Sequence, residues 1–177
     1  MAWAFSLAAE CGEVRADAER FCQHFQRASW TLSNGLQSQV RGDIFQDVEE
    51  NWWGRICPSG MSATGVDHPE TAYLMTELGI LLYQQLQSAP GFRYALVGVE
   101  VDEFRTYGEL RADAGILAAL FPGLVLAESV WRSIGSPLGF RPFARGYVWQ
   151  PYAGEAYQPL RSSLDLSERL NQLSLVQ

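Results

Sequence analysis

Lysine is missing from this chain of 177 residues, and all 13 of its Lys and Arg positions hold arginine. Schiff-base and pyridoxal enzymes, Ser-Lys dyads and Walker-type phosphate loops all need a lysine, so these chemistries are excluded. Histidine is scarce too, with two residues, and the sequence has neither a Gly-x-Ser-x-Gly elbow nor a Gly-rich phosphate-binding fingerprint. These gaps weigh against an enzyme, because acid–base catalysis would be left to carboxylates, tyrosine and cysteine.

Cysteine is also scarce, with three residues. A chain of this length buries enough apolar surface to fold without disulfides, so we expect reduced thiols and a cytoplasmic location. Cys11, Cys22 and His24 lack the closely spaced cysteine pair and the fourth ligand of a structural zinc site. We therefore expect Cys22 to lie in the core, and the protein to hold neither a metal nor a cofactor.

Long hydrophobic runs are absent: no stretch approaches the roughly 20 apolar residues that a membrane-spanning helix needs. The N-terminus also lacks the basic start of a signal peptide. Acidic residues outnumber arginines by 20 to 13, and the formal charge of −7 argues against nucleic-acid binding. Residues 1–90 hold 11 of the acids and five of the arginines, which predicts either a basic protein partner or a solvated acidic surface.

The hydrophobic patterns that are present indicate an α+β fold. Period-two alternation predicts a strand over residues 2–9. Helical periodicity predicts a helix over residues 13–27, with a buried stripe of Val14, Ala18, Phe21, Cys22 and Phe25. A stronger stripe predicts a second helix from Asp67 to the Pro90-Gly91 stop. Residues 92–101 are apolar at both odd and even positions, as in a strand that is covered on both faces.

The Asn34-Gly35 dipeptide predicts a hairpin over residues 28–40. A three-residue loop that ends in a left-handed Gly35 would place Leu32 opposite Leu36. This register puts apolar side chains across from each other, which a two-residue loop would not do.

Asp43 and Gln46 resemble a capping box and predict a short helix with Ile44, Val48 and Trp52 on one face. The Gly-rich residues 54–66 are predicted to form a loop. The resulting order of strand, helix, strand, strand, helix, strand is that of a ferredoxin-like split βαβ core.

The C-terminal third adds further elements. Its patterns predict a helix over 112–121, a strand over 124–127, a helical turn over 130–134, a strand over 146–150 and a terminal helix from Ser163. No linker or repeat interrupts the chain. We therefore expect one α+β domain over residues 1–177 with an elaborated C-terminal third.

Residues 139–159 form an aromatic segment, in which six of 21 residues are aromatic and three prolines and three glycines prevent a long helix. Tyrosine, tryptophan and arginine are enriched in binding hot spots. The predicted contact residues are Trp53, Arg141, Phe143, Arg145, Tyr147, Trp149 and Tyr152. The alternative is that this segment packs on or beside the sheet as an ordered arm.

These features favour a non-enzymatic factor that binds another protein, as a regulator, an assembly factor or an inhibitor such as a toxin-neutralising immunity protein. A basic partner would suit the acidic first half, and a homodimer is compatible with the sequence.

The alternative is a ligand-binding protein or enzyme. Arg141 or Arg145 would clamp an anion, and either Cys57 or the cluster of Glu100, Asp102 and Glu103 would act on it. Cys57 with His68 would be the candidate nucleophile and base.

Overall fold

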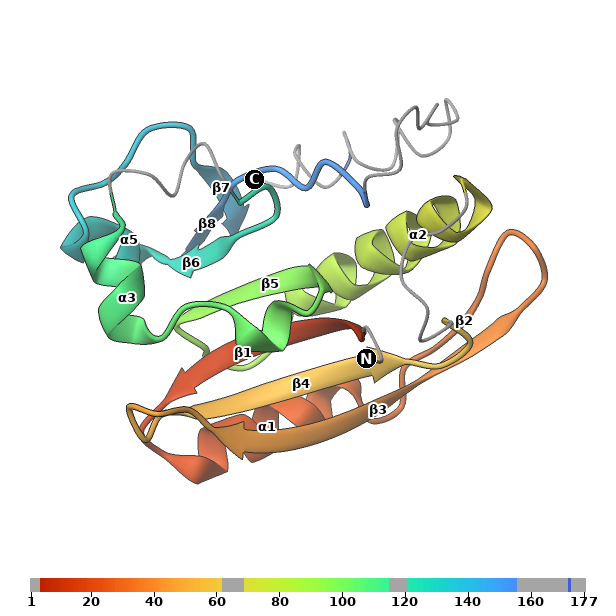
Figure 1. Cartoon of the computed structure of the whole chain (residues 1–177), viewed down its shortest axis with the longest axis horizontal. Coiled ribbons are helices and arrows are strands. Elements are labelled where there is room, and N and C mark those ends of the chain that lie inside the picture. The colour runs from red at the N-terminus through yellow and green to blue at the C-terminus, as the bar shows by residue number, and fades with distance from the viewer. Residues whose placement is uncertain (1–3, 62–68, 115–120, 156–171, 173–177) are drawn as a thin grey trace.

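An eight-stranded sheet forms the centre of the computed structural model, which describes residues 4–61, 69–114, 121–155 and 172. The strands lie in the order β2-β3-β4-β1-β5-β6-β8-β7, and every neighbouring pair is antiparallel (Figure 1). In chain order they are β1 (Phe5–Gly12), β2 (Ser29–Thr31), β3 (Gln37–Gln46), β4 (Trp52–Pro58), β5 (Tyr94–Val99), β6 (Val125–Ala127), β7 (Arg141–Ala144) and β8 (Tyr147–Trp149).

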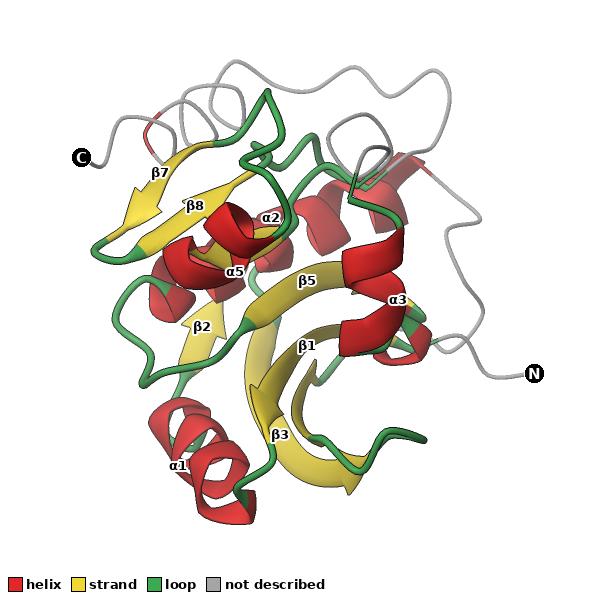
Figure 2. Cartoon of the chain, turned by 90° about the vertical axis from the view of Figure 1, so that its left-hand side faces the viewer, coloured by secondary structure: helices red, strands yellow, loops and turns green. Residues whose placement is uncertain are grey.

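Helices cover both faces of this sheet, each over its own hydrophobic core (Figures 1 and 2). One face carries α1 (Arg15–Phe25) and α2 (Pro69–Leu86). The other carries the short elements η1 (Val101–Glu103), α3 (Tyr107–Ala112) and α5 (Glu128–Ser133). The predicted α+β class is therefore confirmed.

The predicted first strand corresponds to β1, and all eight of its residues are buried. Phe5, Leu7 and Ala9 contribute to the core under α1 and α2, whereas Ala8 contributes to the core on the other face. A strand that is covered on both faces belongs inside a sheet, and β1 indeed lies between β4 and β5.

The helix α1 confirms most of the predicted stripe. Ala18, Phe21 and Phe25 are fully buried, and Cys22 is half-buried. Val14 was wrongly included, because it precedes the helix as its N-cap residue and exposes 56% of its surface.

The predicted hairpin is confirmed in its register. The Leu32 N–H donates to the Leu36 carbonyl at 2.8 Å, and Gly35 is left-handed with a φ of 82°. The hairpin tip is anchored on α2, because the carboxylate of Glu77 accepts hydrogen bonds from the N–H and the hydroxyl of Ser33.

The predicted helix over residues 43–52 is wrong, and so is the loop over its neighbours 54–58. These residues belong to β3, β4 and the turn between them, with Asp43 opposite Arg55 and Phe45 opposite Trp53. The helical spacing of Ile44, Val48 and Trp52 was coincidental. The ferredoxin-like four-stranded core is not supported, since the sheet has eight strands.

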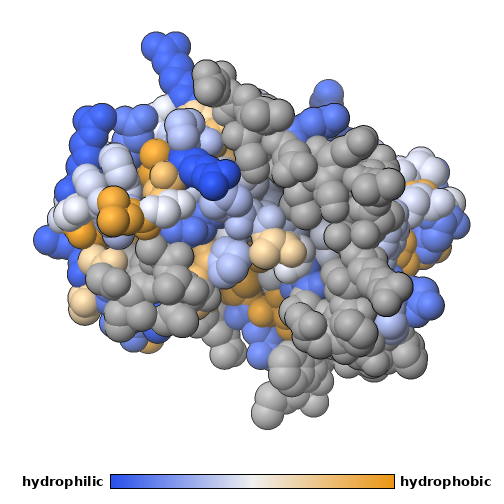
Figure 3. Space-filling view, turned by 90° about the horizontal axis from the view of Figure 1, so that it is seen from above, coloured by the Kyte–Doolittle hydropathy of each residue, from blue (hydrophilic) through white to orange (hydrophobic). Residues whose placement is uncertain are grey.

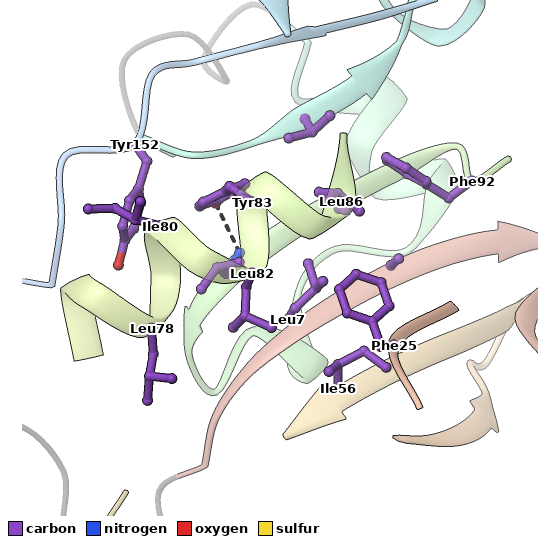
Figure 4. Packing of buried hydrophobic residues seen from close by; sticks show 14 of the residues in the cluster. Leu7, Phe25, Ile56, Leu78, Ile80, Leu82, Tyr83, Leu86, Phe92 and Tyr152 are labelled. Atoms are coloured by element: carbon purple, nitrogen blue, oxygen red, sulfur yellow. Dashed lines mark hydrogen bonds between the residues drawn. The ribbon is translucent and has the colours of Figure 1, made fainter. Parts of the chain in front are cut away.

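The predicted second helix corresponds to α2, whose Tyr83 is fully buried. The Tyr83 hydroxyl donates to the Gly123 carbonyl at 2.7 Å and accepts the Val97 N–H at 3.1 Å. Figure 4 shows this side chain within the same packed cluster as Ile80, Leu86 and Tyr152. Tyr83 therefore ties α2 to β5 and to the start of the C-terminal strands.

The C-terminal predictions were right for the strands β6 and β8, while β7 was missed. The helical turn predicted at 130–134 begins earlier, as α5. The helix α3 ends at Ala112. Residues 115–120 of the helix predicted at 112–121, and nearly all of the terminal helix predicted from Ser163, lie outside the described residues, so both stay predictions. Within the described ranges, no helix has the length and apolar content that crossing a membrane requires.

Candidate functional site

The aromatic residues predicted to bind a partner lie mostly inside the protein. Trp53, Phe143, Trp149 and Tyr152 each expose 6% or less of their surface. On the face over β7, β8 and α5, hydrophilic side chains predominate and apolar ones are scattered among them (Figure 3). Buried rings cannot contact a partner in this structure, so their apolar area serves packing.

The described part of the aromatic segment, residues 139–155, packs against α2. The rings of Phe143, Trp149 and Tyr152 lie with their centroids 6.2, 5.3 and 5.0 Å from that of Tyr83. Edge-to-face and tilted contacts at these distances are favourable for aromatic pairs. Residues 139–155 thus pack on the molecule and contribute β7 and β8 to the sheet.

Trp53, one of the predicted contact residues, is buried, with 2% of its surface exposed. The residue lies on β4, where its ring stacks on Phe45 with centroids 5.9 Å apart and meets Tyr94 edge-on at 5.4 Å. Its Nε1–H donates to the Asp47 carboxylate at 2.8 Å. This contact connects the core on the α3 face to the turn that follows β3.

Arg141 and Arg145 are exposed on β7 and on the turn after it. Tyr147 is half-buried, because its ring stacks on Phe92 at 4.4 Å and its hydroxyl exchanges hydrogen bonds with the Phe92 N–H and carbonyl. Of the seven predicted contact residues, the two arginines are thus the ones classed as exposed, and a binding role for them stays a prediction.

The structure does not bring together the residues of the predicted anion-clamping pocket. Cys57 lies on β4 and Arg141 on β7, with β1, β5, β6 and β8 between them. Five strand spacings correspond to about 24 Å. Asp102 is committed to Arg55, whose guanidinium lies 2.6 Å from it and also bonds to Asp43.

Of the remaining acids of that cluster, Glu100 is the one whose side chain is described. Glu100 is half-buried and left-handed, with a φ of 55°, immediately before η1. The side chain of Glu103 and the whole of His68 lie outside the described residues, so the Cys57–His68 pair stays a prediction.

Burial disfavours the thiolate form of all three cysteines, and at Cys57 it outweighs the opposing effect of Arg55. Burial raises the pKa of Cys57 above its ordinary value, and it raises the pKa of Cys22 to about 11. Cys11 is buried, and burial again raises its pKa. Low thiolate content means low reactivity. Across residues 4–61, 69–114 and 121–155, no group of three metal-ligating side chains forms.

The turn after β3 is exposed and acidic. We call residues 47–51 the acidic turn. Val48 stands at its tip with 92% of its surface exposed, next to the exposed Glu49 and Glu50. An apolar side chain so fully in water contributes nothing to the core.

Hydrogen bonds to Asp47 hold the acidic turn in one conformation. Its Oδ1 accepts the N–H groups of Glu49 and Asn51 at 2.9 and 3.0 Å, and its Oδ2 accepts the Trp53 indole. The backbone closes as a three-residue loop, because the Asp47 N–H donates to the Asn51 carbonyl. Glu50 takes the left-handed position of this loop, with a φ of 62°.

A second brace connects the acidic turn to α3. The Glu49 carboxylate accepts the Thr106 hydroxyl at 2.7 Å and the Gly108 N–H at 3.0 Å. Thr106 also caps α3, in a reciprocal capping box with Glu109. The turn is therefore fixed from both the sheet and the helix, and it carries carboxylates on both sides.

The loop after β1 lies beside the acidic turn, since Gly12 pairs with Trp52. This loop exposes Val14 and Glu13. The Arg15 guanidinium lies 5.2 Å from the Trp52 ring centroid. The end of the sheet thus presents two exposed valines among carboxylates.

A groove of about 520 Å³ opens near this end, lined by Cys11, Asp17, Arg20, Pro90, Gly91, Phe92, Arg93, Ala127, Ser129 and Tyr147. Its charged side chains are already paired. Arg93 holds the fully buried Glu10 through two bonds of 2.5 and 2.6 Å, and Arg20 contacts Asp17. These pairings leave little free charge to fix a small polar ligand.

Sequence reasoning missed the acidic turn, because it assigned Val48 to the buried face of a helix. The signal that could have found it is the strand-like character of Ile44-Phe45 and Trp52-Trp53 on either side of the mostly polar six-residue segment 46–51. Comparison of the sequence with protein-family models found no match, and comparisons with curated proteins and with solved structures found none either.

Proposed function

We propose that the chain is a non-enzymatic factor that binds a basic protein through the acidic turn, as a regulator, an assembly factor or an inhibitor. The observation that carries this proposal is the position of Val48, which is 92% exposed at the tip of a rigid, acidic loop. An apolar residue surrounded by charged ones matches the composition of an interface, which has an apolar centre and a polar rim.

Rigidity favours binding by this turn. Association orders flexible loops at a free-energy cost, and a loop that is already ordered avoids it. The hydrogen bonds to Asp47 and Glu49 provide that order. Glu50 adds a second hint, because a left-handed residue other than Gly or Asn costs about 1–2 kcal/mol. A carboxylate at such a strained backbone position supports a role for its charge.

Charge defines the partner class. The acidic turn and the loop after β1 expose Glu13, Glu49 and Glu50 around Val14 and Val48. Complementary charge steers association and disfavours acidic competitors. We therefore expect a partner with an apolar contact surrounded by lysine or arginine.

The test is affinity purification from the native organism with the full chain as bait, comparing Val48→Arg with the parent. The substitution places a bulky positive charge where the basic partner should dock, so it should abolish capture. Leu138→Arg is the matched control, since Leu138 is also an apolar residue with 88% exposure, but lies between α5 and β7. The captured protein is then purified, and its Kd for the three chains is measured by calorimetry.

We expect Val48→Arg to weaken binding at least about 100-fold, in the range of a hot-spot substitution, with the melting temperature unchanged. Equal affinities for the parent and Val48→Arg would exclude the acidic turn as the contact. A loss that appears with Leu138→Arg instead would place the contact at the α5–β7 loop.

A further inference from the structure

The two edges of the sheet are built differently. The β7 edge is four residues long, contains Pro142 and has an irregular register with β8. Short length, proline and bulges are the devices by which proteins protect an edge from pairing with another chain. At the other edge, β2 covers only Gln37–Gln39 of the ten-residue β3. Residues 40–46 have no strand beside them within the described part of the chain.

The open part of β3 is regular and able to pair. Its register with β4 runs without interruption from Val40 to Gln46, and it contains no proline. The Ser59 N–H donates to the Gln39 carbonyl, and the Asp47 N–H donates to the Asn51 carbonyl. These bonds show that the hydrogen-bonded pairs at the two ends of the β3–β4 ladder involve odd-numbered residues on the β3 side.

Odd-numbered residues of β3 therefore bond to β4, because hydrogen-bonded pairs alternate along an antiparallel ladder. The backbone N–H and carbonyl groups of Val40, Gly42, Ile44 and Gln46 point outward, away from β4. An added strand would find these groups at regular spacing.

The helix α1 leaves space for such a strand. Cys22 touches the positions of both Gly42 and Gly54, so it lies over the gap between β3 and β4 and not over the outer edge. A hollow of about 320 Å³ remains beside this edge, lined by Cys22, Gln23, Gln26, Val40, Arg41 and Gly42. Alternate side chains of an added strand would enter this hollow.

We infer that the β3 edge accepts an extended segment of the basic partner by strand addition, antiparallel to β3 as in every other pair of the sheet. This inference rests on the proposed function, because the edge leads directly into the acidic turn. In antiparallel orientation the N-terminal end of the segment lies beside Gln46 and the carboxylates that follow it. A basic N-terminal end with alternating small apolar residues after it fits this surface.

A second copy of the chain fits this edge less well than a peptide does. The free part of β3 spans residues 40–46, because β2 occupies the positions beside Gln37–Gln39. In a two-fold antiparallel pair of β3 edges, the β2 of each copy would lie beside the acidic turn of the other. A short isolated segment has no such constraint.

Amide hydrogen exchange of the isolated full chain tests the premise. Residues 43 and 45 should be protected by β4, whereas Gly42, Ile44 and Gln46 should exchange fast. Protection of these three amides in the isolated chain would mean that the edge is already covered, and would overturn the inference.

The second measurement uses a blocked heptapeptide with the sequence Lys-Lys-Ser-Val-Ser-Val-Ser, titrated to millimolar concentration while the backbone amides are followed by NMR. We expect shifts at Gly42, Ile44 and Gln46, and at least about tenfold weaker binding when Glu-Glu replaces Lys-Lys. Absence of shifts at these amides, or equal binding of the two peptides, would overturn the inference.

A matched pair of variants isolates the backbone contribution. Gln46→Pro removes both the side chain and the outward backbone N–H. Gln46→Ala removes the side chain and keeps the N–H. Proline is tolerated at an edge position whose N–H faces solvent, so both variants should fold. Binding of the peptide and of the captured partner should fall in Gln46→Pro only. If partner binding is lost in Val48→Arg but kept in Gln46→Pro, strand addition fails while the proposed function stands. If both variants keep it, both proposals fail.

Discussion

Glu10 and Arg93 show how a single buried pair couples charge to stability. The Glu10 side chain is fully buried on β1, and the Arg93 guanidinium that binds it lies 3.9 Å from the Tyr107 ring centroid. Burial raises the pKa of the Glu10 carboxyl above its ordinary value of 4.5, and Arg93 opposes part of that rise. The desolvation free energy of a buried charge exceeds the attraction to its partner unless the geometry of the pair is excellent.

This raised pKa predicts the sign of a pH dependence. Between pH 4.5 and the folded-state pKa, the folded protein keeps a proton that the unfolded chain has released. The contribution of Glu10 to stability is therefore fully present below pH 4.5 and is lost as the pH rises through the folded-state value. Glu10→Gln cannot titrate, so the parent should lose stability relative to Glu10→Gln as the pH rises.

Urea unfolding of both chains at several pH values from 4 to 7 measures this difference, and Glu19→Gln on the exposed side of α1 serves as the control. Glu19 pairs with Arg15 while 45% of its side chain is exposed, so its substitution should change stability by less than about 1 kcal/mol at any pH. A parent that gains stability over Glu10→Gln with rising pH would show that Arg93 outweighs burial.

At the scale of elements, the aromatic arm stabilises α2. Trp149 is fully buried, and its ring meets both Tyr83 and Phe143. Trp149→Ala should lower the free energy of unfolding by about 3–5 kcal/mol, because it removes a large buried ring and leaves a cavity. The Trp149 indole N–H has no hydrogen-bond partner among the described residues. Trp149→Phe keeps the ring contacts and should cost less than half as much.

Chemical denaturation measures both changes, with the exposed Arg145→Ala as a control that should stay within about 0.5 kcal/mol. If Trp149→Ala unfolds like the parent but loses the partner, the ring serves binding and not packing.

The elements that sequence predicted correctly are those whose local signals agree with the tertiary structure. The stripe of α1 and the loop chemistry of Gly35 needed no knowledge of the rest of the chain. β3 was mistaken because Asp43 and Gln46 resemble a capping box, and β4 was mistaken because Gly54 looks like a breaker. The role of Gly54 appears only when α1 packs on it, since a Cβ there would lie 2.7 Å from the Phe21 ring. Tertiary packing overrode the local preference.

The candidate site was harder to predict, for the same reason. Tyrosine and tryptophan are enriched in binding sites and in cores alike, and nothing in residues 139–159 tells which α2 surface they would cover. The acidic excess of residues 1–90 was visible, but its concentration around Val48 depended on a turn that was assigned to a helix. The composition alone predicted a basic partner. The position of the proposed contact could be inferred only from the folded structure.

At the scale of the whole molecule, the chain carries a net charge of −7, and some of its exposed carboxylates lie together at one end of the sheet. The acidic turn and the loop after β1 project from one end of the sheet, with Glu13, Glu49 and Glu50 exposed. Charges at the rim of a contact change the association rate, whereas buried contacts change the dissociation rate.

The rate of association with the captured partner should therefore fall with salt, by about tenfold or more between 0.05 and 0.5 M NaCl, as the Debye length shortens. Glu50→Gln should reduce both the rate at low salt and its salt dependence, while the dissociation rate stays nearly constant. Glu128 on α5 pairs with Arg132. Its substitution Glu128→Gln should change neither the association rate, nor its salt dependence, nor the dissociation rate. Stopped-flow kinetics measures these rates. An association rate independent of salt would show that the acidic end does not steer the partner, and Val48 would then have to act through apolar contact alone.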